Sequence, residues 1–257
     1  MRWLHDLDVV WIALIVIAAV ALLVAAVWFV ATRLATGERG VAMQSVSPGL
    51  LPPLGIVFAL IVGFLAAGVW GDSDKAKDAV STEASALRSV VLLSDQLPPG
   101  TGVQLRALVR RQIDEAVHQE WPAMARQHAS LAAIPVPLAQ ALDVTVAFKP
   151  SGPGQVDAQR ELVAALEKAL DARRERIIVS GSRVNAVKWT GMLALAVVML
   201  VAIASVHSAN RRTAALAISL FGAALAVVIV MLLAQDRPFS GQLGQKPDLL
   251  EQVVPRS

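Results

Sequence analysis

Residues 51–74 read LPPLGIVFALIVGFLAAGVWGDSD, and this stretch decides the fold. Two prolines precede a run of seventeen uncharged residues from Leu54 to Trp70, and acidic residues follow it. A helix needs about 20 predominantly apolar residues to cross the hydrocarbon core of a bilayer. We therefore expect a membrane-spanning helix over Leu50–Trp70.

This expected helix carries two neighbouring stripes of unlike side chains, since residues four apart lie on one face of a helix. The small stripe consists of Gly55, Ala59, Gly63, Ala67 and Gly71. The bulky stripe consists of Ile56, Leu60 and Phe64. Small residues at every fourth position let membrane helices approach closely. The pattern indicates either helix packing alone or a helix whose copies surround an apolar constriction at a symmetry axis.

The whole chain has the composition of a membrane protein. Of its 257 residues 56% are hydrophobic, and its mean hydropathy is +0.59. Four runs without Asp, Glu, Lys or Arg are long enough to span a bilayer, namely Val9–Ala31, Leu50–Trp70, Trp189–Val206 and Ala214–Ala234. The third run is the shortest, and we expect it to continue from a helix outside the membrane. The fold class is therefore an all-α integral membrane protein with four transmembrane helices and a large helical segment between spans two and three.

The domain organisation follows from these runs. Residues 1–70 hold transmembrane helices 1 and 2, residues 71–188 a cytoplasmic helical region, residues 189–235 transmembrane helices 3 and 4, and residues 236–257 a cytoplasmic tail. Lysines and arginines near the span ends are more numerous on the side of both termini, which favours cytoplasmic termini in a bacterial inner membrane. Arg211 and Arg212, in the short loop between the last two spans, argue the other way.

Residues 71–188 are expected to form helices with apolar stripes. The first, Asp72–Gln96, continues from span two. The second runs from Thr101 to His128, and Pro122 inside it predicts a kink or break near Trp121. A short helix is expected around Val136–Val146, and a long one runs from Gln155 and joins span three. On that long helix we expect the basic cluster to be a solvated face that pairs with its acidic neighbours; these residues are Arg173, Arg174 and Arg176 with Glu167, Asp171 and Glu175. Contact of the same arginines with lipid headgroups is the alternative.

No catalytic, metal or cofactor pattern is present. The chain has no cysteine, four scattered histidines, no phosphate-binding glycine loop and no GxSxG nucleophile elbow. A membrane enzyme is therefore disfavoured, and the near-balanced charge of residues 71–188 disfavours nucleic acid as a partner. Proton-coupled carriers generally need ionisable groups inside the membrane. Spans without such groups leave a passive pore that apolar residues gate by dewetting.

The order of several motifs resembles the bestrophin-like family of bacterial and plant membrane proteins. The resemblance extends from Pro48 to about Pro247. It is carried by Gly63-Phe64, Glu83-Ala84-Ser85-Ala86-Leu87, Glu120-Trp121-Pro122, Arg173-xx-Arg176 and Asp236-Arg237-Pro238-Phe239-Ser240-Gly241.

This family is distantly similar to the bestrophins, which are pentameric anion channels. The resemblance implies that Ile56, Leu60 and Phe64 line the neck of a pore, and that the turn of Asp236, Pro238 and Phe239 corresponds to a Pro-Phe-Gly motif after span four. Pro238 also has a structural interpretation, because proline ends the span-four helix and Phe239 can pack at the interface. The acidic cluster of calcium-controlled bestrophins is missing after Phe239, so no calcium site is expected.

Two functions remain open at this point. The first is an oligomeric ion channel for inorganic ions, most readily anions, whose pentameric state is implied only by the resemblance and whose neck is lined by Ile56, Leu60 and Phe64. The second is a non-conducting membrane scaffold or signalling partner. In that case Gly55, Ala59, Gly63 and Ala67 would only pack helices within one subunit.

Overall fold

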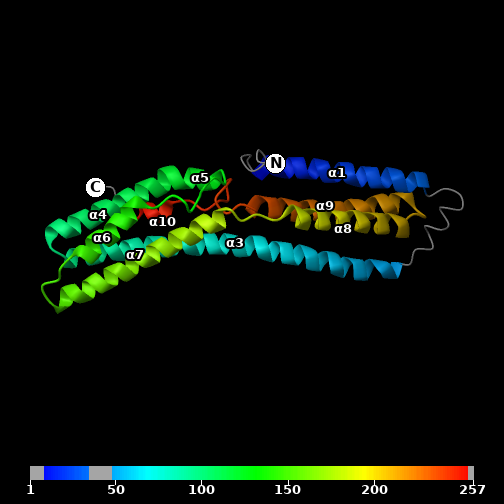
Figure 1. Ribbon diagram of the computed structural model, residues 1–257. Helices are drawn as coiled ribbons and strands as arrows, with labels where there is room; N and C mark the ends of the chain where they lie inside the picture. The colour runs from blue at the N-terminus through cyan, green and yellow to red at the C-terminus, as the bar shows by residue number, and fades with distance from the viewer. Residues whose placement is uncertain (1–8, 35–47, 254–257) are drawn as a thin grey trace. The chain divides into compact units, whose positions relative to one another are not determined.

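The computed structural model describes residues 9–34 and 48–253, and all regular secondary structure in them is helical (Figure 1). The chain divides into two compact units. The first, called here the membrane unit, holds the described residues of 1–70 and 183–236; the second unit holds 71–182 and the described residues of 237–257. The start of the expected segment 1–70 and the loop 35–47 lie outside the described residues.

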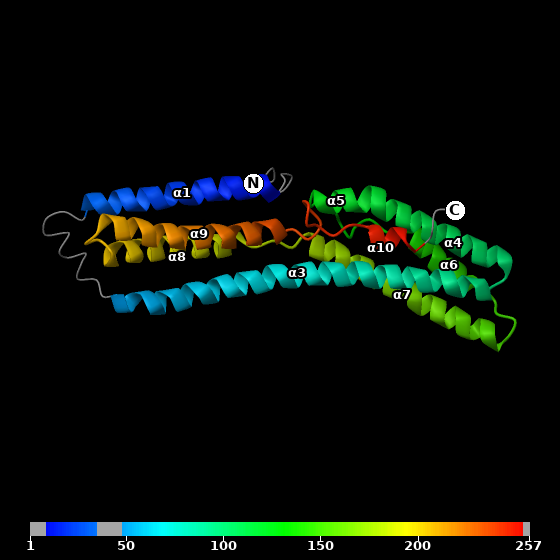
Figure 2. The ribbon, with the colours of Figure 1, turned by 180° about the vertical axis from the view of Figure 1, so that it is seen from behind.

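The membrane unit consists of four long apolar helices. They are α1 (Val9–Leu34), the first part of α3 (Leu51–Leu93) after a short 3-10 turn at Pro48–Leu50, α8 (Ala186–Val206) and α9 (Arg211–Gln235). Each is long and apolar enough to cross a membrane. The views from front and back show α1 and α8 alongside α9 (Figure 1, Figure 2). The expected fold class, all-α with four candidate membrane spans, is confirmed.

Gly222 of α9 fixes how closely α1 and α9 approach. A Cβ atom built on Gly222 would lie 2.5 Å from Cγ2 of Val24 and 3.5 Å from Cγ1 of Val20. Real side chains do not come this close, so only glycine admits the observed spacing of these two helices.

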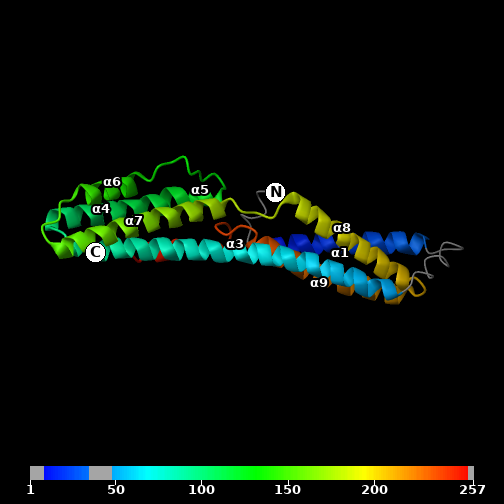
Figure 3. The same cartoon turned by 60° about the horizontal axis from the view of Figure 1, so that its bottom comes forward.

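The second unit is a helical bundle around its own apolar core. Its elements are the remainder of α3, the 3-10 turn Ser94–Gln96, α4 (Pro99–Glu115), a π-helical turn at Ala116–Glu120, α5 (Trp121–Ala125), α6 (Val136–Ala147), α7 (Pro153–Ser180) and α10 (Asp248–Glu251). Figure 3 shows α4, α6 and α7 side by side within this unit. The core side chains are almost fully buried and include Leu87, Leu105, Met124, Leu138, Leu162 and Leu166.

The helix that begins with α4 is irregular where the sequence predicts a kink or break, but it does not end there: it passes through the π-helical turn and continues as α5. The backbone N–H of Trp121 donates to the carbonyl of Ala116, five residues earlier, which makes the preceding turn π-helical. Pro122 has no N–H to donate, so the regular pattern cannot pass through it. The starts of α4 and α7 differ from the prediction by two residues: both helices begin at a proline, Pro99 and Pro153, because the first helical position needs no N–H.

The expectation that the long helix joins span three is wrong. α7 ends at Ser180, residues 181–185 are not helical, and α8 begins at Ala186. Asn185 is the reason for the new start, since its side chain accepts a hydrogen bond from the N–H of Val187 at 3.0 Å. The N–H of Val184 donates to Oδ1 of Asp236 at 2.7 Å, so a carboxylate also holds the extended backbone.

Candidate functional site

One face of α3 packs against the other helices of the membrane unit. Leu65 and Val69 are buried in a cluster with residues of α1, α8 and α9. Nearer the start of the helix, Phe58 packs against Phe221 of α9, with the ring centroids 5.4 Å apart. Leu54 adds to a neighbouring cluster. Successive positions in this set are four or seven residues apart and therefore form one stripe along the helix.

The bulky stripe lies nearly opposite this packed face. Its three side chains are exposed in the single chain, by 62% for Ile56, 55% for Leu60 and 76% for Phe64. Four residues rise by about 6 Å along a helix, so the stripe extends over about 12 Å of the axis. A stripe from one chain cannot enclose a channel, so any ring needs further copies of α3.

The small stripe beside it is also uncovered. A Cβ atom built on Gly55 or Gly63 would have no atom within 4 Å, in contrast to the crowded Gly222. Ala59 and Ala67 are exposed. Nothing in the described part of this chain packs against these glycines, so their close-packing role remains a prediction about contacts with another chain.

Two residues at the end of span four, Asp236 and Phe239, contact different parts of the chain. Asp236 ends α9 and holds the backbone of Val184, as described above. Phe239 belongs to the second unit, where it is buried and packs edge-to-face on Trp121 with the ring centroids 5.6 Å apart. The expectation that Phe239 packs at the membrane interface is therefore wrong, because the ring finds an aromatic partner in the core of the second unit.

The segment after Pro238 is bound to the turn around Trp121. The carbonyl of Pro238 accepts a hydrogen bond from the N–H of Gln245 at 2.7 Å, and the indole N–H of Trp121 donates to the carbonyl of Gln245 at 2.9 Å. The hydroxyl of Ser240 donates to the carbonyl of Ala125 at 2.7 Å. The C-terminal segment is thus part of the second unit's core.

The second unit contains a buried charge cluster where the sequence predicts a solvated face. Arg173 and Arg176 of α7 are almost fully buried, and Nη2 of Arg176 donates to Oε2 of Glu120 at 2.6 Å. Nε of Arg173 donates to Oε1 of the same carboxylate at 2.7 Å, and Glu83 of α3 pairs with Arg176 from its other side. The predicted pairing with neighbours on α7 is wrong for Arg173 and Arg176, because buried charges need partners that are themselves removed from water.

Arg176 is the centre of this cluster. Its guanidinium lies 4.8 Å from the centroid of the Trp121 ring, and Nη1 contacts the sulfur of Met124 at 3.5 Å. Burial lowers the pKa of Arg176, but the carboxylates of Glu83 and Glu120 outweigh this effect and raise it above the ordinary value. The guanidinium therefore stays charged inside the protein core.

The spacing of α7 contains a signal for this burial. Leu162, Leu166 and Ala169 are buried at intervals of four and three residues, and Arg173 and Arg176 continue the same intervals. A charged residue on the continuation of an apolar stripe predicts a buried ion pair. No group of three or more His, Cys, Asp or Glu side chains among the described residues could hold a metal ion.

Comparison with known proteins places the chain in a family. A family model described as the bestrophin-like domain matches residues 17–248, which is most of the chain. The chain belongs to the bestrophin-like family. The resemblance carried by the sequence motifs is thereby confirmed, and the family supports an ion channel as the general class of function. A search of curated proteins gives no match.

Solved structures share the fold of this bestrophin-like protein. Two crystal structures of a bacterial bestrophin homologue from Klebsiella pneumoniae, each with one point mutation, superpose with TM-scores of 0.72 and 0.69. Both are 12% identical and match over 93% of this chain, and over 97% and 96% of theirs. The helical arrangement is therefore that of a bestrophin, although the sequences have diverged widely.

Proposed function

We propose that this bestrophin-like protein is a homo-oligomeric ion channel of the bacterial inner membrane, in which copies of α3 surround the pore. The observation that carries the proposal is the uncovered face of α3. It presents the bulky side chains of Ile56, Leu60 and Phe64 beside glycines that no described residue of the chain covers. Several copies of such a helix can come close enough to form a ring.

The proposed neck consists of three apolar rings, one from each bulky position. A narrow apolar passage loses its water and blocks ions until it widens. The described membrane helices contribute no carboxylate to this stretch, and residues 54–70 contain no ionisable group at all. The neck would therefore act as a gate, and the sign of the permeant ion would be set elsewhere along the pore.

Anions are the proposed cargo, and five is the proposed number of subunits. The proposed ion and the proposed subunit number both rest on the distant relation to bestrophins. Neither is argued from a contact between residues of this chain. We further propose that both termini and residues 71–182 face the cytoplasm, since most lysines and arginines near the span ends lie on that side.

Two measurements test the proposal. The subunit number of the purified protein from native mass spectrometry comes first, because a monomer would contradict a central pore and a ring of four or more would support it. Currents in planar bilayers come second, with chloride and potassium gradients that separate anion from cation flux. Absence of current from an intact ring under varied voltage, pH and calcium would favour a non-conducting scaffold instead.

A further inference from the structure

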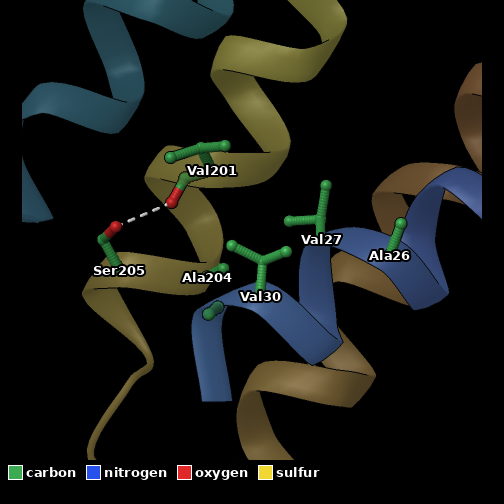
Figure 4. Close-up of a pocket in the computed structure, with 7 residues that line it drawn as sticks. Ala26, Val27, Val30, Val201, Ala204 and Ser205 are labelled. Atoms are coloured by element: carbon green, nitrogen blue, oxygen red, sulfur yellow. Dashed lines mark hydrogen bonds between the residues drawn. The ribbon is translucent and has the colours of Figure 1, made fainter. Parts of the chain in front are cut away.

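An apolar pocket lies between α1 and α8 in the membrane unit. It measures about 220 Å³ and is lined by Ala26, Val27, Val30, Ala31, Val201, Ala204 and Ser205. Figure 4 shows Val27 and Val30 of α1 facing Val201 and Ala204 of α8. Val30 and Val201 are half exposed, so the pocket is open to the outside of the described helices.

The lining offers an occupant no free hydrogen-bond donor. Its one hydroxyl, on Ser205, already donates to the carbonyl of Val201 at 2.8 Å (Figure 4). A polar ligand would lose its hydrogen bonds to water here without replacement. The pocket therefore suits a hydrocarbon chain, and the hydrocarbon present around a membrane helix is lipid.

Arginines gather at the end of the helices where the pocket lies. Gly222 sets α9 at the level of Val24 on α1. Arg33 follows Val24 by nine residues on α1, and Arg211 precedes Gly222 by eleven residues on α9. At a rise of 1.5 Å per residue, these two arginines lie about 13 Å and about 16 Å from that level, toward the same end of the unit. Arg211 and Arg212 are exposed, and Arg33 lies over the ring of Phe29.

This end of the unit has a clear positive charge. Residues 24–34 and 201–222 contain three arginines and no Asp or Glu. The segment 35–47, outside the described residues, adds Glu38 and Arg39 and hence no net charge. Arginines at the end of membrane helices attract the negatively charged headgroups of anionic lipids.

We propose that this pocket binds one acyl chain of an anionic phospholipid, whose phosphate lies against Arg211, Arg212 and Arg33. A side chain from a second copy of this protein could fill the pocket but would not explain the arginines at its end. A phospholipid explains both, because one molecule carries an apolar chain and a charged phosphate. The proposal does not depend on ion conduction.

The experiment is lipid retention by the full chain in native mass spectrometry. Dioleoylphosphatidylglycerol and dioleoylphosphatidylcholine are offered at equal concentration, because they share their acyl chains and differ in net charge. We expect the anionic lipid to bind roughly tenfold or more tightly, given two or three arginines near its phosphate. Equal retention of the two lipids would overturn the proposal.

Variants separate the two halves of the site. Replacement of Arg211 and Arg212 by Gln should bring phosphatidylglycerol down to the level of phosphatidylcholine, while the same change at the exposed Arg126 and Arg174 of the second unit should not. Ala26→Phe fills the pocket and should lower retention of both lipids. Ala25→Phe, at the exposed neighbouring position outside the lining, is its control.

Three further outcomes would reject the phospholipid. Unchanged lipid retention in Ala26→Phe would show that the lipid binds elsewhere. A changed subunit number in that variant, with lipid retention intact, would assign the pocket to a neighbouring copy. Displacement of the lipid by soluble glycerol phosphate would show that the arginines recognise a free phosphate without the acyl chain.

Discussion

The carboxylate of Glu83 and the guanidinium of Arg176 form a two-pronged ion pair inside the second unit. Nε of Arg176 donates to Oε2 of Glu83 at 2.6 Å, and Nη2 donates to Oε1 at 3.1 Å. Neither side chain is exposed, and the two residues belong to α3 and α7. The pair thus joins the continuation of the proposed pore helix to the longest helix that packs beside it within this unit.

Arg176→Met should destabilise the protein strongly. The change leaves the carboxylate of Glu83 buried without a cation, and loss of one partner from a buried pair costs about 3–5 kcal/mol. Thermal unfolding of the detergent-solubilised protein, followed by circular dichroism, measures the loss. Arg174→Met is the matched control, because Arg174 is exposed on the same helix and should leave the unfolding temperature nearly unchanged.

Glu83→Gln in the Arg176→Met background should restore part of that stability. The neutral amide costs less to bury than an unpaired carboxylate, and Arg173 still neutralises Glu120 through a contact of 2.5 Å. The same unfolding measurement, arranged as a double-mutant cycle, gives the coupling between the two residues. Additive effects would show that Arg176 stabilises the unit independently of Glu83, through its other contacts with Glu120, Trp121 and Met124.

Two glycines in the membrane unit should respond oppositely to the same substitution. Gly222→Leu places a side chain where Val24 already lies. Such overpacking typically costs about 1–3 kcal/mol of folding free energy, and we expect a loss of at least this size for Gly222→Leu. Gly63→Leu meets open space in the single chain and should leave its unfolding temperature unchanged. Native mass spectrometry of the Gly63 variant should instead show loss of the oligomer, if α3 packs against its own copies. An intact oligomer would remove Gly63 from that interface.

The C-terminal segment should detach when Phe239 is truncated. Phe239→Ala removes a buried ring and its edge-to-face contact with Trp121, a change that costs typically about 3–5 kcal/mol. Hydrogen–deuterium exchange should rise at the N–H of Gln245, which the carbonyl of Pro238 now protects. Leu243→Ala, at an exposed position of the same segment, should leave this exchange as it is.

The membrane spans and most helices of the second unit could be predicted because they depend on local patterns. The apolar runs, the irregular turn before Trp121 and the short helix at Val136 follow from hydropathy, proline chemistry and periodicity within a few turns. The break after Ser180 does not follow from such patterns, because it depends on the side-chain cap of Asn185 and on Asp236, about fifty residues away in sequence.

The buried charge cluster shows a second limit. Arg173 and Arg176 have acidic neighbours on their own helix, and the local pattern therefore favours a solvated face. Their partners Glu83 and Glu120 lie more than fifty residues away, so only the packing of α3, the π-helical turn and α7 brings the four charges together. The bulky stripe of α3 shows a different limit. Its exposure can be seen in the single chain, but its proposed partner is another copy of the protein.

Phe64→Ser tests the proposed neck most directly. Phe64 is the most exposed bulky residue of the stripe, and a hydroxyl in its place would let water enter a passage that the ring keeps dry. We expect the basal current in planar bilayers to rise severalfold, with a smaller rise for Leu60→Ala. Leu216→Ser is the control, because Leu216 is equally apolar and exposed by 63% but lies on α9. If Leu216→Ser raises the current as much as Phe64→Ser does, the effect comes from the lipid-facing surface. If both α3 variants leave the current unchanged, Ile56, Leu60 and Phe64 do not form the neck.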